Sequence, residues 1–189
     1  MNKDPIAECA CALGQIPGGL FILTSAFETR RGGVAVRWVQ QCSVAPPMVT
    51  VALYKGQPVE MLIRDSHSFT LCQISADDRF LLHKFNGQRD NGEDPLLPLM
   101  TRAAPSGCPI IGRALSYLDC EVVRHVELDG DYRIYVGQVH SGGVLNTGAP
   151  AIQFGPLGGN GNGANGVHPP NGGNGTTGSA SGPRAAQDQ

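Results

Sequence analysis

One stretch decides the expected fold: GGVAVRWVQQCSVAPPMVTVALYK, residues 32–55. Its first half has the β-branched alternation of a half-buried strand. Its second half alternates Val49, Val51 and Leu53 with smaller or polar residues, as a second strand does. Between the two halves lie a polar segment and a Pro-Pro corner. The stretch therefore predicts a strand, a polar loop, a corner and a second strand that ends at a lysine.

The polar segment carries side chains that bind anions. Four of them can converge with loop N–H groups on one phosphate: Arg37, Gln40, Gln41 and Ser43. Lys55 arrives from the end of the second strand. The alternative for Arg37 and Lys55 is an ordinary solvated position, and Gln41 and Ser43 also suit a simple turn. The pattern thus favours an anion site but leaves a purely structural reading open.

The rest of the chain reads as short strands joined by hairpins, with few helices. Expected helices cover residues 5–13, 58–64 and 77–85, the last with Ser75 as its N-cap. Further expected strands cover residues 20–26, 68–74, 114–126, 132–140 and 151–154. The regular alternation of strands and helices that a parallel sheet needs is absent from the sequence. This pattern predicts a mainly β fold with minor α, built as a closed or nearly closed antiparallel barrel.

Two segments are poor in apolar residues. Residues 86–107 are polar and rich in Pro and Gly, which predicts either a lid over a site or a mobile loop. Residues 155–189 are mostly Gly, Asn, Pro, Ser and Thr, and cannot bury enough surface to offset their ordering entropy. We therefore expect one domain over residues 1–154 and a disordered Gly/Asn-rich tail over residues 155–189. The G-x-G-x-x-G match at residues 161–166 lacks the flanking strand and helix that dinucleotide binding requires, so we treat it as accidental.

Composition argues against several classes of protein. The formal net charge is -2 over 189 residues, and no stretch clusters Lys and Arg with aromatic residues, so nucleic acid is not an expected partner. No apolar stretch has the length of a membrane span or of a signal peptide, which predicts a soluble, cytoplasmic protein. The six cysteines are expected to be reduced thiols. Neither Cys9-x-Cys11 nor the scattered histidines predict a metal site.

Short motifs occur in a fixed order before and after this stretch. Around WVQQCSVAPP at residues 38–47 lie IPGGL at 16–20, FTL at 69–71, HKF at 83–85, GED at 92–94, GCPI at 107–110, ALSYLDCEV at 114–122 and GDY at 130–132. This order, more than any single motif, resembles the flavin reductase-like family, whose members share the FMN-binding split barrel. The version with a tryptophan and paired glutamines is most similar to the reductase domains fused to flavodiiron proteins in cyanobacteria. The resemblance covers about residues 13–154.

The resemblance implies a homodimer of split barrels with FMN, in preference to FAD, near the subunit interface. Residues 37–43 would hold the phosphate and the ribityl chain, and Lys55 would approach the phosphate or the ring. The implied cofactor-binding residues are Arg37, Trp38, Val39, Gln40, Gln41, Cys42, Ser43, Lys55 and His83. The implied activity is that of an NAD(P)H-dependent flavin oxidoreductase. It would pass electrons from NAD(P)H through bound flavin to free flavin, a partner protein or a small acceptor.

Three of these residues also have simpler interpretations. Trp38 either packs against the flavin ring or fills the interior of the barrel. Cys42 beside a flavin suggests redox chemistry, although a free cysteine is more often a small apolar residue. His83 lies either near the cofactor or on an ordinary helix surface.

One position departs from the family pattern. Family members commonly have a histidine after the Gly-Asp of the last hairpin, near the nicotinamide or the flavin edge, and here the residue is Tyr132. A tyrosine stacks and donates one hydrogen bond, but it carries no charge near neutral pH. Tyr132 is therefore both a candidate contact to nicotinamide and the reason for an alternative function, that of a non-enzymatic FMN-binding or electron-relay protein.

Overall fold

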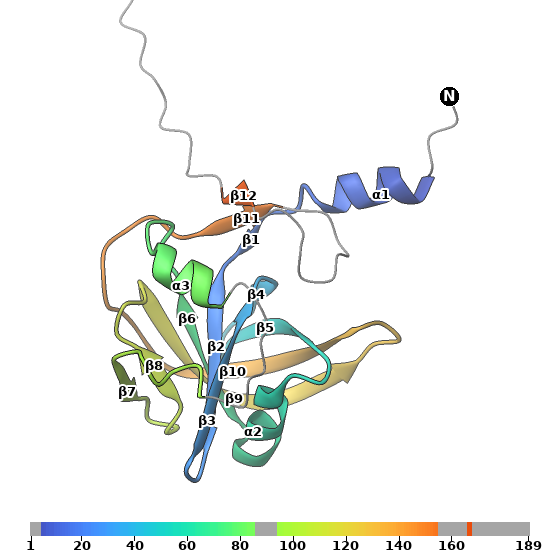
Figure 1. The fold of residues 1–189 in the computed structure, drawn as a ribbon. Helices are drawn as coiled ribbons and strands as arrows, with labels where there is room; N and C mark the ends of the chain where they lie inside the picture. Colours follow the sequence, from blue (N-terminus) through green and yellow to red (C-terminus); the bar gives the residue numbers. More distant parts are fainter. Residues whose placement is uncertain (1–4, 86–93, 155–165, 168–189) are drawn as a thin grey trace, which may run out of the picture.

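The computed structural model describes residues 5–85, 94–154 and 166–167. A seven-stranded antiparallel sheet with the strand order β3-β2-β6-β9-β10-β5-β4 dominates these residues (Figure 1). Its strands are β2 (Phe21–Phe27), β3 (Arg30–Val36), β4 (Val39–Val44), β5 (Pro47–Tyr54), β6 (Ser68–Gln73), β9 (Ser116–Glu127) and β10 (Tyr132–Val144). Two small sheets accompany it, one formed by β1 (Gly18–Gly19), β11 (Ile152–Phe154) and β12 (Gly166–Val167), the other by β7 (Thr101–Ala103) and β8 (Pro109–Ile111).

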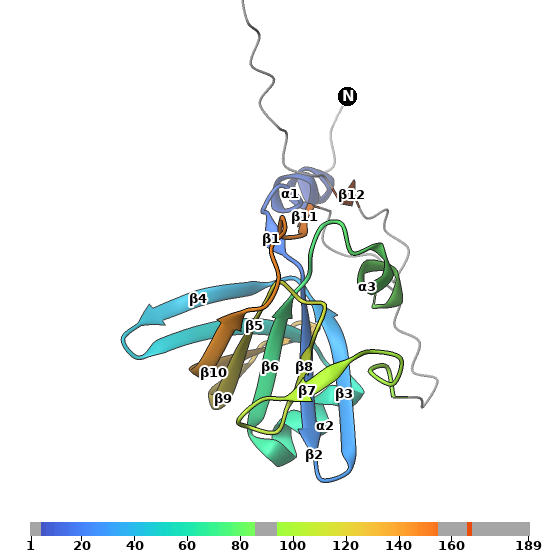
Figure 2. The same ribbon diagram turned by 90° about the vertical axis from the view of Figure 1, so that its left-hand side faces the viewer.

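The edge strands of the large sheet, β3 and β4, follow each other in the chain. Only residues 37 and 38 separate Val36, which pairs with β2, from Val39, which pairs with β5. The sheet therefore curls until its two edges meet at this crossing (Figures 1 and 2). Among the described residues no ladder joins β3 to β4, so the barrel is split along this line. The expected mainly β, antiparallel fold with a few short helices is confirmed.

In the described ranges, three short helices accompany the barrel. α1 (Pro5–Leu13) extends away from it beyond β1 (Figure 1). α2 (Pro58–Ser66) buries Val59, Leu62 and Ile63 against the sheet, and α3 (Arg79–Lys84) buries Leu81. In the described part of the chain, no helix has both the length and the apolar character that crossing a membrane requires.

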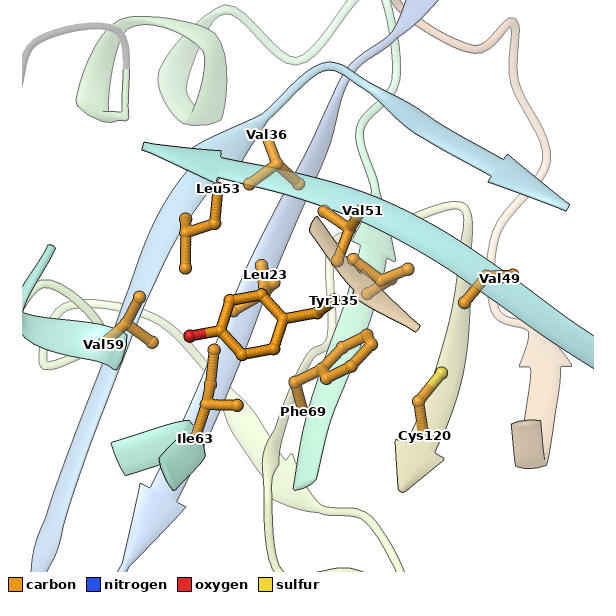
Figure 3. Packing of buried hydrophobic residues seen from close by; sticks show 11 residues of the cluster. Leu23, Val36, Val49, Val51, Leu53, Val59, Ile63, Phe69, Cys120 and Tyr135 are labelled. Carbon is orange, nitrogen blue, oxygen red and sulfur yellow. The ribbon is translucent and has the colours of Figure 1, made fainter. Parts of the chain in front are cut away.

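The main core lies inside the curled sheet (Figure 3). Alternate residues of β5, namely Val49, Val51 and Leu53, are buried there, as the period-2 pattern predicts. They share this core with Phe69 of β6. Gly137 of β10 is required opposite Phe69, because a Cβ at this position would lie 2.5 Å from a ring carbon. The intervening residues of β5 consequently face outward.

Several expected boundaries differ from the structure. Residues 40–43, expected as a loop, lie within β4, which pairs with β5 through a register shift between Gln41 and Ser43. The polar sequence gave no strand signal because this edge hairpin is exposed on both faces, so no alternation develops. α3 is capped by Asp78 rather than by Ser75, since the Leu81 N–H donates to the Asp78 carboxylate at 3.1 Å.

The polar segment 86–107 contains structure that the sequence pattern did not indicate. Its described part, from residue 94 on, includes β7, which pairs with β8 as a small hairpin. Residues 86–93, the first part of the expected lid or loop, lie outside the described residues. The same holds for most of the expected tail, of which residues 166 and 167 are described as β12, paired with β11.

Candidate functional site

A hollow of about 240 Å³ opens on the outer face of the sheet at the crossing between β3 and β4. Its lining comes from four places in the chain: the turn before β1, the crossing itself, and the outward faces of β4–β5 and of β10. The lining residues are Ile16, Pro17, Gly18, Arg37, Trp38, Val39, Gln40, Thr50, Ala52 and Ile134. The walls are thus mainly apolar, with one guanidinium, one amide and one hydroxyl.

Strand register explains why distant residues meet at this hollow. Gln40 of β4 pairs with Thr50 of β5, and Ala52 of β5 pairs with Ile134 of β10. Side chains paired across an antiparallel ladder lie on the same face. The Thr50 hydroxyl also donates to the Gln40 carbonyl at 3.3 Å, which fixes the start of β4 against β5. The outward residues of three strands therefore form one continuous wall.

Three aromatic rings lie side by side at this end of the sheet. The Trp38 and Tyr132 ring centroids are 4.6 Å apart at an interplanar angle of 56°, and Tyr54 meets Tyr132 edge-on at 5.5 Å. Trp38 is nevertheless 38% exposed and Tyr54 is 44% exposed. Large aromatic residues that pack on each other and still face solvent offer a surface on which a planar ligand can stack.

The surroundings of this cluster keep the Tyr132 phenol neutral and leave the Arg37 guanidinium open to solvent. Burial and the nearby Asp131 carboxylate raise the pKa of Tyr132, and the Arg37 guanidinium offsets only part of this rise. The phenol therefore stays neutral well beyond neutral pH. Arg37 is exposed, and its guanidinium makes no hydrogen bond or ion pair with any described residue. A cation without a partner beside an apolar hollow is suited to an anionic ligand.

The structure divides the expected site residues 37–43 into two groups. Four of the expected residues line the hollow: Arg37, Trp38, Val39 and Gln40. Gln41, Cys42 and Ser43 continue along the hairpin that projects from the barrel (Figure 2). The Gln41 amide donates to the Ser43 carbonyl at 3.1 Å, and Cys42 is an exposed free thiol at the register shift. These three residues are not brought to the hollow of a single chain.

Lys55 and His83 also lie away from the hollow. The Lys55 ammonium donates to the carbonyls of Leu128 and Gly130 at 2.6 and 2.8 Å, in the turn between β9 and β10. His83 is exposed on α3, which lies on another side of the molecule from the β4–β5 hairpin (Figure 2).

Some lining residues were not expected from the sequence. Thr50 and Ala52 follow from the alternation of β5, because they are the outward neighbours of Val49, Val51 and Leu53. Ile134 carried no such signal, since its place depends on the register between β10 and β5. Ile16 is 61% exposed and precedes the Pro17-Gly18 turn. An exposed apolar side chain at a hollow is typical of a surface that a ligand or another chain covers.

A second hollow, of about 250 Å³, lies between the end of α2, β9 and the turn before β8. Its central group, the Asp119 carboxylate, is 2% exposed and accepts hydrogen bonds from the Thr70 hydroxyl, the Ser106 N–H and the Ser106 hydroxyl. Across the described ranges 5–85, 94–154 and 166–167, no group of three or more His, Cys, Asp or Glu residues is placed to hold a metal ion.

Comparisons with known proteins identify relatives of the chain. The "Flavin reductase like domain" family matches residues 13–157. "Diflavin flavoprotein A 1" from Synechocystis sp. is 34% identical over 134 residues, covering 70% of this chain and 23% of that protein. "Putative diflavin flavoprotein A 4" from Nostoc sp. is 31% identical, covering 75% and 24%. The chain thus spans about a quarter of the length of the curated relatives it matches.

Solved structures show the same fold at lower identity. Nitrilotriacetate monooxygenase component B from Mycobacterium thermoresistibile has a TM-score of 0.70 at 22% identity, covering 79% of this chain and 82% of that one. The NADH:FAD oxidoreductase of Streptomyces globisporus C-1027 has a TM-score of 0.70 at 19% identity, covering 82% and 91%. The family match over most of the described barrel is decisive: this chain belongs to the flavin reductase-like family.

Proposed function

We propose that the chain is an FMN-binding oxidoreductase that passes electrons from NAD(P)H through the flavin to free flavin, a partner protein or a small acceptor. One observation carries the proposal: the Arg37 guanidinium, which has no hydrogen-bond or ion-pair partner among the described residues, lies beside an apolar hollow rimmed by the exposed Trp38 ring. A cation next to an aromatic surface matches a ligand that joins a phosphate to a planar ring. The family membership supports a flavin as this ligand.

The residues of the hollow have separate parts in this proposal. Arg37 would hold the phosphate, and a charge-assisted hydrogen bond of this kind contributes about 1.5–3 kcal/mol. The Gln40 amide would hydrogen-bond the ribityl chain, and Trp38 would pack against the ring system. Val39, Ala52 and Ile134 would exclude water from it. The flavin, when bound, supplies the hydride chemistry, and the protein supplies its position and surroundings.

We favour FMN over FAD because the described lining of the hollow contains one guanidinium, that of Arg37, which suits one terminal phosphate. Lys55 is bound to the turn between β9 and β10 and does not add a second cation there. A related structure is by name an NADH:FAD oxidoreductase, so the choice needs a direct test. Release of the bound cofactor by heat, followed by chromatography against both standards, identifies it.

A second copy of the chain would complete the site. Pockets that enclose a ligand of this size usually have a volume of about 300–1,000 Å³, whereas the hollow of one chain has about 240 Å³. The β4–β5 hairpin projects from the barrel, and Val44 at its end is 82% exposed (Figure 2). A homodimer would cover this exposed edge strand and close the hollow. Sedimentation at micromolar concentration should give twice the mass of one chain, and a monomer would contradict this part of the proposal.

The electron acceptor is proposed from relatives. One structure of the same fold is by name component B of a monooxygenase, which makes a partner protein a reasonable acceptor beside free flavin. Freshly purified protein should be yellow and should bleach under anaerobic conditions when NADH or NADPH is added. Protein that neither carries nor takes up flavin would overturn the proposal.

Tyr132 favours a second candidate, a non-enzymatic flavin-binding or electron-relay protein. Its phenol has a raised pKa and is therefore neutral, so it supplies no charge to attract a nicotinamide nucleotide. The same anaerobic titration separates the two candidates. A yellow protein that stays yellow with both nicotinamides, but bleaches with a chemical reductant, would be a relay rather than a reductase.

A further inference from the structure

The side chain of Lys55, the residue directly after β5, binds the turn between β9 and β10. Three groups of the turn surround the Lys55 ammonium: the Leu128 carbonyl at 2.6 Å, the Gly130 carbonyl at 2.8 Å and the Glu127 carboxylate at 3.6 Å. The two carbonyls accept hydrogen bonds from the ammonium, and the carboxylate forms a longer ion pair with it. The Lys55 backbone N–H also donates to the Asp131 carbonyl at 3.0 Å. Lys55 therefore fastens the whole turn to the end of β5.

This turn leads directly into Tyr132, the first residue of β10. Tyr132 pairs across the ladder with Tyr54, the residue before Lys55, and its ring packs at a tilt against Trp38. Leu128 and Gly130 are exposed, so little packing by apolar side chains holds the turn in place. The contacts that Lys55 makes therefore restrain the turn that leads into Tyr132, beside the ladder pairing of Tyr132 with Tyr54.

A second set of contacts restrains the next residue on the opposite face of β10. Arg133 donates to the Glu60 carboxylate of α2 at 2.8 Å. It also contacts the Glu127 carboxylate, which forms the ion pair with Lys55. Glu60 accepts in turn from the Gly56 N–H at 2.7 Å. Because side chains alternate along a strand, these contacts hold the backbone of β10 from the core side and leave the Tyr132 ring on the outer side.

We infer that Lys55 is a positioning residue that sets the Tyr132–Trp38 pair at the rim of the hollow, instead of a ligand of the cofactor phosphate. The inference rests on the proposed function only in taking this rim as the wall of the flavin site. In Lys55→Met the turn loses its anchor, and the Tyr132 ring no longer covers Trp38. In Lys55→Arg the guanidinium has enough donors to restore the contacts to the two carbonyls and to Glu127.

Two measurements test this role, and the first needs no flavin. Trp38 is the single tryptophan of the chain, so its emission reports on the rim alone. Lys55→Met should shift the emission to longer wavelength and increase quenching by acrylamide, Lys55→Arg should resemble the wild type, and Lys84→Met on α3 should change nothing. If Lys55→Met does not fold by circular dichroism, Lys55→Gln replaces it with the same expectation. Unchanged emission in the folded variant would overturn the inference, whether or not the protein binds flavin.

The second measurement compares FMN with riboflavin, which lacks the phosphate. A displaced rim weakens both ligands alike, so Lys55→Met should raise both dissociation constants by a similar factor of about tenfold. A lysine that binds the phosphate would instead weaken FMN and leave riboflavin unchanged, and that result would overturn the inference. Failure of the wild type to bind either flavin would refute the proposed function, and the emission of Trp38 would still decide the role of Lys55.

Discussion

Two hollows of nearly equal volume, about 240 and 250 Å³, differ in what their charged groups do. In the hollow at the crossing, the Arg37 guanidinium is exposed and has no acceptor among the described residues. In the other, Asp119 is 2% exposed and its carboxylate accepts three hydrogen bonds from Thr70 and Ser106. A satisfied buried carboxylate stabilises the fold, whereas an unsatisfied exposed cation is free for a ligand. Whether the charged group in the lining already has hydrogen-bond partners therefore says more about ligand binding than the volume of the hollow does.

The largest expected effect concerns the stability that Asp119 provides. Asp119→Ala leaves the buried Thr70 hydroxyl without its acceptor and also removes the charged acceptor of two donors of the exposed Ser106, so the free energy of unfolding should fall by about 3 kcal/mol. Urea unfolding measures the fall. Glu121→Ala, an exposed carboxylate at the same hollow, is the matched control and should be nearly neutral. Weakened FMN binding in a stable Asp119→Ala protein would show that the hollow at Asp119 also serves the ligand, which would contradict the distinction between a structural and a binding hollow.

The next effect concerns affinity at the other hollow. Arg37→Gln removes the unpartnered guanidinium, so the dissociation constant for FMN should rise by about 10- to 100-fold while that for riboflavin stays unchanged. Stability should change little, because the guanidinium makes no hydrogen bond or ion pair with a described residue. Arg79→Gln on α3 is the charge-matched control. Equal losses for FMN and riboflavin would show that Arg37 does not bind the phosphate.

A smaller effect is expected from the aromatic rim. Trp38→Leu keeps an apolar wall but removes the stacking surface, so FMN and riboflavin should both bind about five- to tenfold more weakly. Phe80→Leu on α3 changes a similarly exposed ring, 47% against 38%, and should leave both affinities alone. Unaltered affinity in Trp38→Leu would show that Trp38 packs in the barrel and does not contact the flavin.

The smallest effect is a pH dependence at Tyr132. Its pKa is raised in the folded protein, so its contribution to stability is complete below the usual tyrosine pKa and is lost as the pH rises through the raised value. Reduction by NAD(P)H should therefore show no ionisation of Tyr132 near neutral pH. Tyr132→His introduces a group with a pKa of about 6.5, so the rate should rise about two- to threefold on acidification through that pH. A flat profile in this variant would place residue 132 away from the nicotinamide.

Alternation in β5 explains how much of the molecule the sequence could predict. Val49, Val51 and Leu53 mark the core face, and this single pattern identifies a central strand and, by exclusion, its outward residues. The period-3.6 pattern likewise placed α2 near its observed start at Pro58. Regular elements with one buried face are readable because burial and periodicity coincide.

Other features depend on contacts between distant residues and had no local signal. The strand at residues 40–43 is exposed on both faces, so its polar sequence looks like a loop. The β7–β8 hairpin has three residues in each strand, too few to show a period. Lys55 finds its carbonyl partners 73 and 75 residues further along the chain. Its expected place beside Arg37 followed from a nearby position in the sequence, whereas its observed contacts follow from the register of β10 on β5.

The central claim, that the hollow at the crossing of β3 and β4 binds a flavin phosphate and ring, is tested most directly by titrating FMN against Trp38 fluorescence. The account predicts saturable quenching in the wild type, because the ring of the ligand packs on the single tryptophan. It also predicts that Arg37→Gln shifts the titration to higher FMN concentration and leaves the riboflavin titration in place. FMN binding without quenching of Trp38, or FMN titrations that coincide in the two proteins, would contradict it.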